Sequence, residues 1–175
     1  MKKSFKFGLI AAGMLAIAPI GLSVVNTSVP VQAAQKIYGK GKKYTIPSSY
    51  HGTWYANKSN VKSVVTIGAH SFNGKTAYHQ NKKAIPDRIY NPSTKAQFRE
   101  QKRVMNATKN IWGAYYTKRS DGNYLTFAPW IGFEEWYMFK PKTMKVNGKT
   151  VKYLAYSSGY VNAKYFKTRS LAKKY

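Results

Sequence analysis

Short runs of apolar and aromatic residues alternate with turn-forming residues along most of the chain. The turn signals are clusters of asparagine, glycine, serine and aspartate. The runs between them are rich in tyrosine, valine, phenylalanine and tryptophan, which fit a pleated and half-buried surface. We therefore expect strands at residues 51–56, 61–69, 75–79, 111–118, 124–130, 135–140, 143–146, 151–157 and 160–168.

Two of the turns predict tight hairpins. The Asn-Gly pairs at 73–74 and 147–148 supply the residues that accept positive φ at both central positions of a type I′ turn. A two-residue turn at the first site pairs Ser71 with Thr76. The chain on either side of each Asn-Gly pair is thus expected to form antiparallel neighbours.

One segment departs from the strand pattern. Thr94 and Gln97 have the spacing of a capping box, and good helix formers follow, with Phe98 and Met105 seven residues apart. We expect one short helix near residues 94–106. Its remaining surface is either a basic strip for an anionic partner or an ordinary solvated helix face. The candidate anion-binding residues are Lys95, Arg99, Lys102 and Arg103.

The first 33 residues have the pattern of a secretory signal peptide. Three lysines precede an apolar run at residues 9–25, which leads to a small-residue site ending in Ala33. We expect cleavage after Ala33, then a flexible Gly/Lys-rich leader at 34–43 and a single β-domain at 44–175.

The exported chain shows no motif for covalent attachment to a cell surface. It has neither a Leu-Pro-x-Thr-Gly sorting motif nor a lipobox cysteine. Because the whole sequence lacks cysteine, stability depends on packing and thiol chemistry is excluded. Export without disulfides is typical of Gram-positive bacteria. We expect a protein that is secreted and either released or held non-covalently at the cell wall.

Charge is the next strong constraint. The chain has 30 lysines and arginines against five acids, and loss of the three signal lysines leaves a formal net charge of +22. A surface this basic attracts polyanions, and the attraction weakens with salt. The expected partner is anionic wall polymer such as teichoic acid, or an anionic membrane surface, and no motif indicates specific nucleic-acid binding. The alternative is that the charge serves solubility alone.

Aromatic side chains are concentrated between residues 112 and 139. In a strand at 111–118, Trp112, Ala114 and Tyr116 share one face and the intervening residues share the other. We expect one aromatic face to belong to the core and the other to accept a sugar ring or a small apolar ligand. The alternative is that the tyrosines pack under lysine stems. The candidate ligand-binding residues are Trp112, Tyr116, Trp130 and Trp136.

The sequence from Gly52 to Tyr55 resembles the Gly-x-Trp-Tyr opening of lipocalin-like (calycin) barrels. The resemblance implies a mainly β fold, an antiparallel meander that closes into a lipocalin-like barrel with one short inserted helix. It places Trp54 at the barrel base under an arginine from the end of the last strand, for which Arg169 is the match, in a cation–π contact. Gly52, Trp54 and Arg169 thus have structural roles, and the barrel interior is either open or filled.

The C-terminal third is similar to surface-layer-associated wall-binding modules of Gram-positive bacteria. The likeness lies in the hairpin at 146–149, the strand at 153–156 and the closing strand at 159–166, rich in lysine and tyrosine. The whole chain resembles small basic secreted proteins of these bacteria that open with His/Arg-Gly-Thr-Trp-Tyr. Both likenesses imply non-covalent retention at the wall.

Few residues are suited to catalysis. The two adjacent glutamates point to opposite faces of a strand, so they do not flank one glycosidic bond. Glu100 is expected to pair with Arg103 or a nearby lysine, and Asp121 to cap its own turn. We expect no enzyme activity. The acids of the chain are Asp87, Glu100, Asp121, Glu134 and Glu135.

The histidines do not predict a metal site. The expected hairpin makes His70 and His79 diagonal neighbours on one face, and the sequence names no third ligand. We expect neither a metal nor another cofactor.

The sequence therefore predicts a non-enzymatic cell-surface binding protein. Charge retains it on anionic wall polymer, and its aromatic face accepts a small apolar or sugar ligand. Two alternatives stay open: a cationic antimicrobial or membrane-active effector, and a wall-polymer hydrolase centred on Asp87 or Glu135.

Overall fold

The computed structural model describes residues 37–132 and 136–175. The expected signal peptide, the start of the leader, and Glu134 and Glu135 lie outside the described residues. The chain from Ala34 onward forms one compact unit. Within the described ranges no helix is long and apolar enough to cross a membrane.

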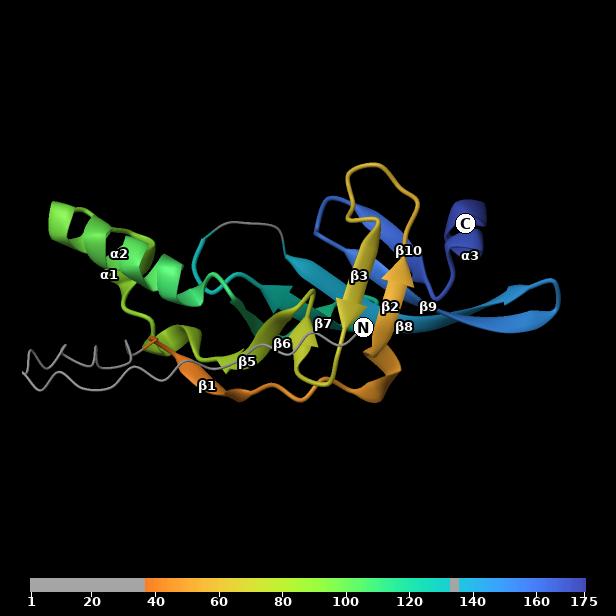
Figure 1. The fold of residues 1–175 in the computed structure, drawn as a ribbon, viewed down its shortest axis with the longest axis horizontal. Coiled ribbons are helices and arrows are strands. Elements are labelled where there is room, and N and C mark those ends of the chain that lie inside the picture. Colours follow the sequence, from red (N-terminus) through yellow and green to blue (C-terminus); the bar gives the residue numbers. More distant parts are fainter. Residues whose placement is uncertain (1–36, 133–135) are drawn as a thin grey trace, which may run out of the picture. The chain divides into compact units, whose positions relative to one another are not determined.

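The described chain is mainly β, with the order of elements shown in Figure 1. The helices are α1 (Asp87–Tyr90), α2 (Lys95–Thr108) and α3 (Arg169–Lys174), with short 3-10 turns at Ser48–Tyr50 and Lys82–Ala84. The strands are β1 (Lys40–Lys43), β2 (Gly52–Tyr55), β3 (Val64–Ile67), β4 (Ser71–Phe72), β5 (Lys75–Gln80), β6 (Ile111–Arg119), β7 (Gly122–Ala128), β8 (Tyr137–Val146), β9 (Lys149–Ser157) and β10 (Asn162–Phe166).

The ten strands form one sheet whose pairing closes into a ring. The order is β1-β5-β4-β3-β2-β10-β9-β8-β7-β6, and β6 pairs back onto β5. All pairings are antiparallel except β5 with β6, so the expected meander is interrupted there. The connection between these two parallel strands contains α1 and α2, because parallel neighbours need a crossover.

The predicted hairpins are confirmed. Val146 pairs with Lys149 across Asn147-Gly148, and Ser71 pairs with Thr76 across the other Asn-Gly turn. Both central residues of each turn have positive φ.

The expectation of one helix is wrong, because α1 and α3 accompany the expected helix, which is α2. Expected strand boundaries also differ from the structure at two places. The last four residues of the expected leader form β1, which pairs with β5. The strands expected at 135–140 and 143–146 are joined, over their described part, into β8. Pro141 lies within β8 without ending the strand. β7 pairs with β8 only as far as Phe139, so beyond that residue one side of β8 has no neighbouring strand, and proline is tolerated there.

A large aromatic core lies inside the ring. Each strand from β2 to β10 contributes at least one buried side chain to a single cluster, as strand alternation requires. Phe72 is fully buried at its centre and stacks on Phe127 with ring centroids 4.5 Å apart. Of the expected shared face, Trp112 and Ala114 belong to this core, whereas Tyr116 is exposed.

A second, smaller core joins the crossover helices to the outer face of β5 and β6. Its buried residues are Ile85, Ile89, Val104, Trp130 and Ile131, with Tyr78 and Ile111 packed beside them. The predicted capping box of α2 is confirmed. The Thr94 side chain accepts a hydrogen bond from the Gln97 backbone N–H, and the Gln97 side chain accepts one from the Thr94 backbone N–H. The helix face is different from expectation: Phe98 and Met105 are exposed, and Val104 and Thr108 are buried.

The Asn147-Gly148 turn gives a direct test of this fold. Gly148 has φ of +76° and open space around its Cβ position, so Gly148→Ala adds backbone strain without a clash. We expect a loss of about 1 kcal/mol in the free energy of unfolding, measured by urea denaturation. Lys149→Ala is the control and should lose less than about 0.5 kcal/mol. Equal losses would contradict the turn geometry.

Candidate functional site

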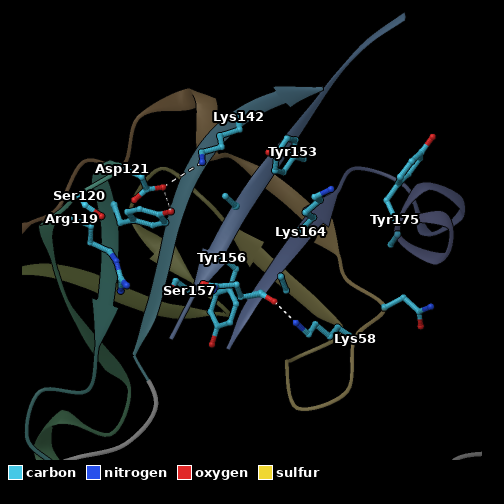
Figure 2. Close-up of a pocket in the computed structure, with 16 residues that line it drawn as sticks. Lys58, Arg119, Ser120, Asp121, Lys142, Tyr153, Tyr156, Ser157, Lys164 and Tyr175 are labelled. Carbon is cyan, nitrogen blue, oxygen red and sulfur yellow. Dashed lines mark hydrogen bonds and ion pairs between the residues drawn. The ribbon is translucent and has the colours of Figure 1, made fainter. Parts of the chain in front are cut away.

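A cleft of about 560 Å³ lies between the β6–β7 turn, β8, β9, β10, the loop after β2 and α3 (Figure 2). We call it the basic cleft. Four cationic side chains from four separate segments surround it, and Asp121 is the acidic residue among its described lining residues. The four cations are Lys58, Arg119, Lys142 and Lys164.

The β6–β7 turn positions the polar end of the cleft. Arg119 pairs with Gly122, so Ser120 and Asp121 form a two-residue turn. Gly122 has φ of +119°, and a Cβ there would lie 2.5 Å from the Lys140 Nζ atom. The missing side chain leaves room for the Lys140 ammonium, which donates a hydrogen bond to the Asp121 carbonyl.

Asp121 does not cap its turn as expected. Its carboxylate accepts a hydrogen bond of 2.8 Å from the Tyr124 hydroxyl and forms an ion pair of 3.3 Å with Lys142. The Tyr124 hydrogen bond and the nearby lysines lower the pKa of Asp121. Burial and the carboxylate raise the pKa of Tyr124 to about 12. Near neutral pH the pair is therefore a carboxylate and a phenol that donates to it.

Tyrosine rings support the cations. Arg119 lies 5.9 Å from the Tyr124 ring centroid, and Lys164 lies 5.9 Å from that of Tyr153. Lys58 donates a hydrogen bond of 2.6 Å to the Asn162 carbonyl. These contacts orient the positive charges without neutralising them, because a ring or a carbonyl carries no formal charge.

Aromatic packing fixes the side of the cleft next to α3. The Phe166 ring lies 5.8 Å from Tyr153 and 5.9 Å from Tyr175. Tyr175 follows α3, whose Thr168 side chain caps the helix by accepting from the Leu171 backbone. Figure 2 shows Tyr175 and Arg119 on opposite sides of the cleft.

A second cleft of about 460 Å³ has Lys142 and Tyr153 in common with the basic cleft among its lining residues. Trp54 and Lys167 also line this neighbouring cleft. Burial lowers the pKa of Lys167, whose Nζ atom lies 3.8 Å from the Trp54 ring centroid.

The expected partner of Trp54 is therefore wrong. Lys167 covers the Trp54 ring, and Arg169 lies 5.1 Å from the ring centroid of Tyr55 instead. Lys167 and Arg169 contact different rings because the chain turns at Thr168 to begin α3. This turn carries Arg169 past Trp54. A cation from the end of the last strand covers Trp54, but it is an ammonium.

The structure does not bring the expected aromatic ligand residues together. Trp112 is buried in the large core, where its indole donates to the Phe72 carbonyl. Trp130 is buried in the small core and donates to the Tyr38 carbonyl. Tyr116 and Trp136 are exposed. Two of the four are thus core residues, since their indole N–H groups find backbone partners inside.

The expected anion-binding residues of α2 are all exposed: Lys95, Arg99, Lys102 and Arg103. The expected partner of Glu100 is wrong. Glu100 forms an ion pair of 2.9 Å with Arg88 and accepts a hydrogen bond of 2.7 Å from the Tyr38 hydroxyl. The hydrogen bond from Arg88 is the larger cause, and that from Tyr38 the next, of the lowered pKa of Glu100.

The histidines and Asp87 have local contacts. The Nε2 atom of His51 lies 2.8 Å from a backbone carbonyl oxygen, and the Nδ1 atom of His70 lies 2.9 Å from another. The His79 ring packs on the Tyr44 ring. Asp87 accepts a hydrogen bond from Asn91 within α1. No group of three His, Asp or Glu side chains within residues 37–132 and 136–175 is arranged to hold a metal ion.

Sequence reasoning missed the basic cleft. Lys140 and Lys142 stand two residues apart and so share a strand face, which was an available signal. Lys58 and Lys164 carry no such signal, because a loop and a distant strand bring them together.

No protein-family model, no curated protein and no solved structure matches this chain.

The contact on Trp54 leads to a prediction. Lys167→Gln removes the ammonium from the indole face and should lower the free energy of unfolding by about 1 kcal/mol. Near-ultraviolet circular dichroism should change with it, because the environment of Trp54 changes. Arg169→Gln is the control and should leave the tryptophan signal as it is. A change of the tryptophan signal in Arg169→Gln but not in Lys167→Gln would show that Arg169 is the partner of Trp54.

The Asp121 carboxylate predicts a pH-dependent stability. Its pKa is lowered in the folded state, so its contribution is present above the unfolded pKa of about 4 and is lost as pH falls through the folded value. Asp121→Asn should therefore have a lower melting temperature than the parent at neutral pH, and the difference should narrow as the pH falls below the unfolded pKa of about 4. Calorimetry of both chains across this range checks the prediction, and a constant gap contradicts it.

Proposed function

We propose that this protein binds anionic polymers of the bacterial cell surface, such as teichoic acid, through the basic cleft. The observation that carries the proposal is the set of four cations around one cleft, three of them held on tyrosine rings or a backbone carbonyl and the fourth paired with Asp121. Asp121 is the one acidic side chain among the described lining residues, so this lining has an excess of positive charge that favours an anionic ligand.

The spread of the cations favours an extended ligand over a small one. They come from four separate segments around one cleft of about 560 Å³. A polymer with regularly spaced negative groups contacts several of these cations at once. Such multivalent contact gives strong retention from weak single pairs.

A tyrosine gives the cleft a place for sugar or polyol units. The half-buried Tyr153 presents a flat apolar surface with a polar edge beside Lys164. The expected ligand platform is thereby moved from the tryptophans to Tyr153. This keeps the sequence-based interpretation of charge and aromatics acting together, at a different place.

The wider proposal is a secreted, non-enzymatic protein retained at a Gram-positive cell wall. It rests on the signal-peptide pattern and the basic charge of the sequence. The ring-like strand pairing and the cation on Trp54 support a lipocalin-like barrel, although β5 and β6 pair in parallel. In this proposal the barrel is filled by its aromatic core and binds ligands outside the ring.

Sedimentation with Gram-positive cell walls tests the proposal. The chain beginning at Ala34 should bind walls that carry teichoic acid, lose most of that binding in walls stripped of it, and dissociate as salt rises. Lys164→Gln should weaken binding about two- to fivefold. Lys83→Gln, an exposed lysine outside the cleft, is the charge-matched control and should change binding less.

Asp121→Asn provides a change of opposite sign. Removing the carboxylate raises the positive charge of the cleft, so this variant should bind the polymer more tightly than the parent. Equal effects of Lys164→Gln and Lys83→Gln, with none from Asp121→Asn, would place binding outside the cleft.

A further inference from the structure

The exposed face of α2 carries an alternating stripe of lysines and large apolar residues. Lys95, Lys102 and Lys109 are seven residues apart, and Phe98 and Met105 stand between them with the same spacing. Residues three or four apart are neighbours on a helix surface, so the five side chains follow one line along the helix. We call this line the α2 stripe.

The apolar members of the stripe are open to solvent. Phe98 is 55% exposed and Met105 is 44% exposed. The other exposed large apolar residues of the described chain are scattered over different elements. The buried side of the helix is already used, because Val104 and Thr108 face the small core. The exposed apolar side chains therefore lie on the outward face of a helix whose other face is packed.

The charge of the stripe is uncompensated. Glu100 is turned toward Arg88 and Tyr38, which satisfy its carboxylate. Arg99 and Arg103 add positive charge on the same exposed helix. A second copy of this surface would be repelled, and a hydrated polymer would gain nothing from a phenylalanine and a methionine.

We infer that the α2 stripe docks on an anionic lipid surface, with α2 lying in the plane of the interface. Phe98 and Met105 enter the boundary between headgroups and acyl chains. The lysine stems pass alongside them and keep their ammonium groups at the phosphates. This interaction is separate from polymer binding, because the basic cleft is formed by other elements and α2 lies apart from α3 (Figure 1).

Vesicle flotation tests the inference with the chain beginning at Ala34. The chain should float with vesicles of equal parts phosphatidylglycerol and phosphatidylcholine and stay behind with phosphatidylcholine alone. The double variant Phe98→Ser/Met105→Ser should lose about tenfold in partitioning. Tyr160→Ser is the matched control, since Tyr160 is 99% exposed but stands alone on the β9–β10 turn, and should partition like the parent.

A fluorescent label gives a second readout that does not depend on affinity. The chain has no cysteine, so Met105→Cys and Tyr160→Cys each accept one environment-sensitive dye. The dye at position 105 should shift to the blue with anionic vesicles, and the dye at position 160 should not. Equal partitioning of the double variant and parent, or no shift at position 105, overturns the inference.

The same variants separate this inference from the proposed function. Phe98→Ser/Met105→Ser should bind teichoic acid like the parent, and Lys164→Gln should float with vesicles like the parent. A parent chain that floats with anionic vesicles but does not bind teichoic acid would reject only the proposed function.

Discussion

Aromatic packing inside the ring of strands is the constraint on which the rest of the structure depends. Phe72 contacts Trp112, Phe127, Tyr137 and Phe139, so one side chain from the short strand β4 connects β6, β7 and β8 across the interior. No disulfide assists, because the chain has no cysteine. Large rings bury much area for each residue, and this burial has to offset the entropy of ordering the chain. The outer faces of the strands are then left for charged side chains.

Local sequence signals identified the two Asn-Gly hairpins and the start of α2, but not β1, α1, α3 or the parallel strand pairing. Asn-Gly turns and the Thr94–Gln97 capping box depend on backbone geometry within a few residues, and the structure confirms them. The parallel pairing of β5 with β6 depends on a crossover of some thirty residues, which no local pattern specifies. The same limit explains the change at Trp54, where a helix start at Thr168 decides which cation reaches the ring.

The candidate site shows the difference between composition and placement. The sequence indicates that lysine, arginine and tyrosine act together, yet it does not show which tyrosines face solvent. Trp112 and Trp130 are the largest apolar side chains in their segments and are drawn into the two cores. Tyr124 is buried as well, with its hydroxyl on Asp121, whereas Tyr153 is half-buried beside Lys164. Burial thus selects among aromatic residues after the strands have paired.

The closure between β2 and β10 has a consequence for the order of folding. Among the described strands this closure consists of one residue pair, Tyr55 with Phe166, supported by Arg169 on Tyr55 and Tyr175 on Phe166. These residues lie near opposite ends of the described chain. During synthesis, β2 therefore waits with one edge unpaired until almost all later residues have emerged. Such distant contacts form slowly, so a partner that holds the early strands during folding would shorten the exposure of that edge.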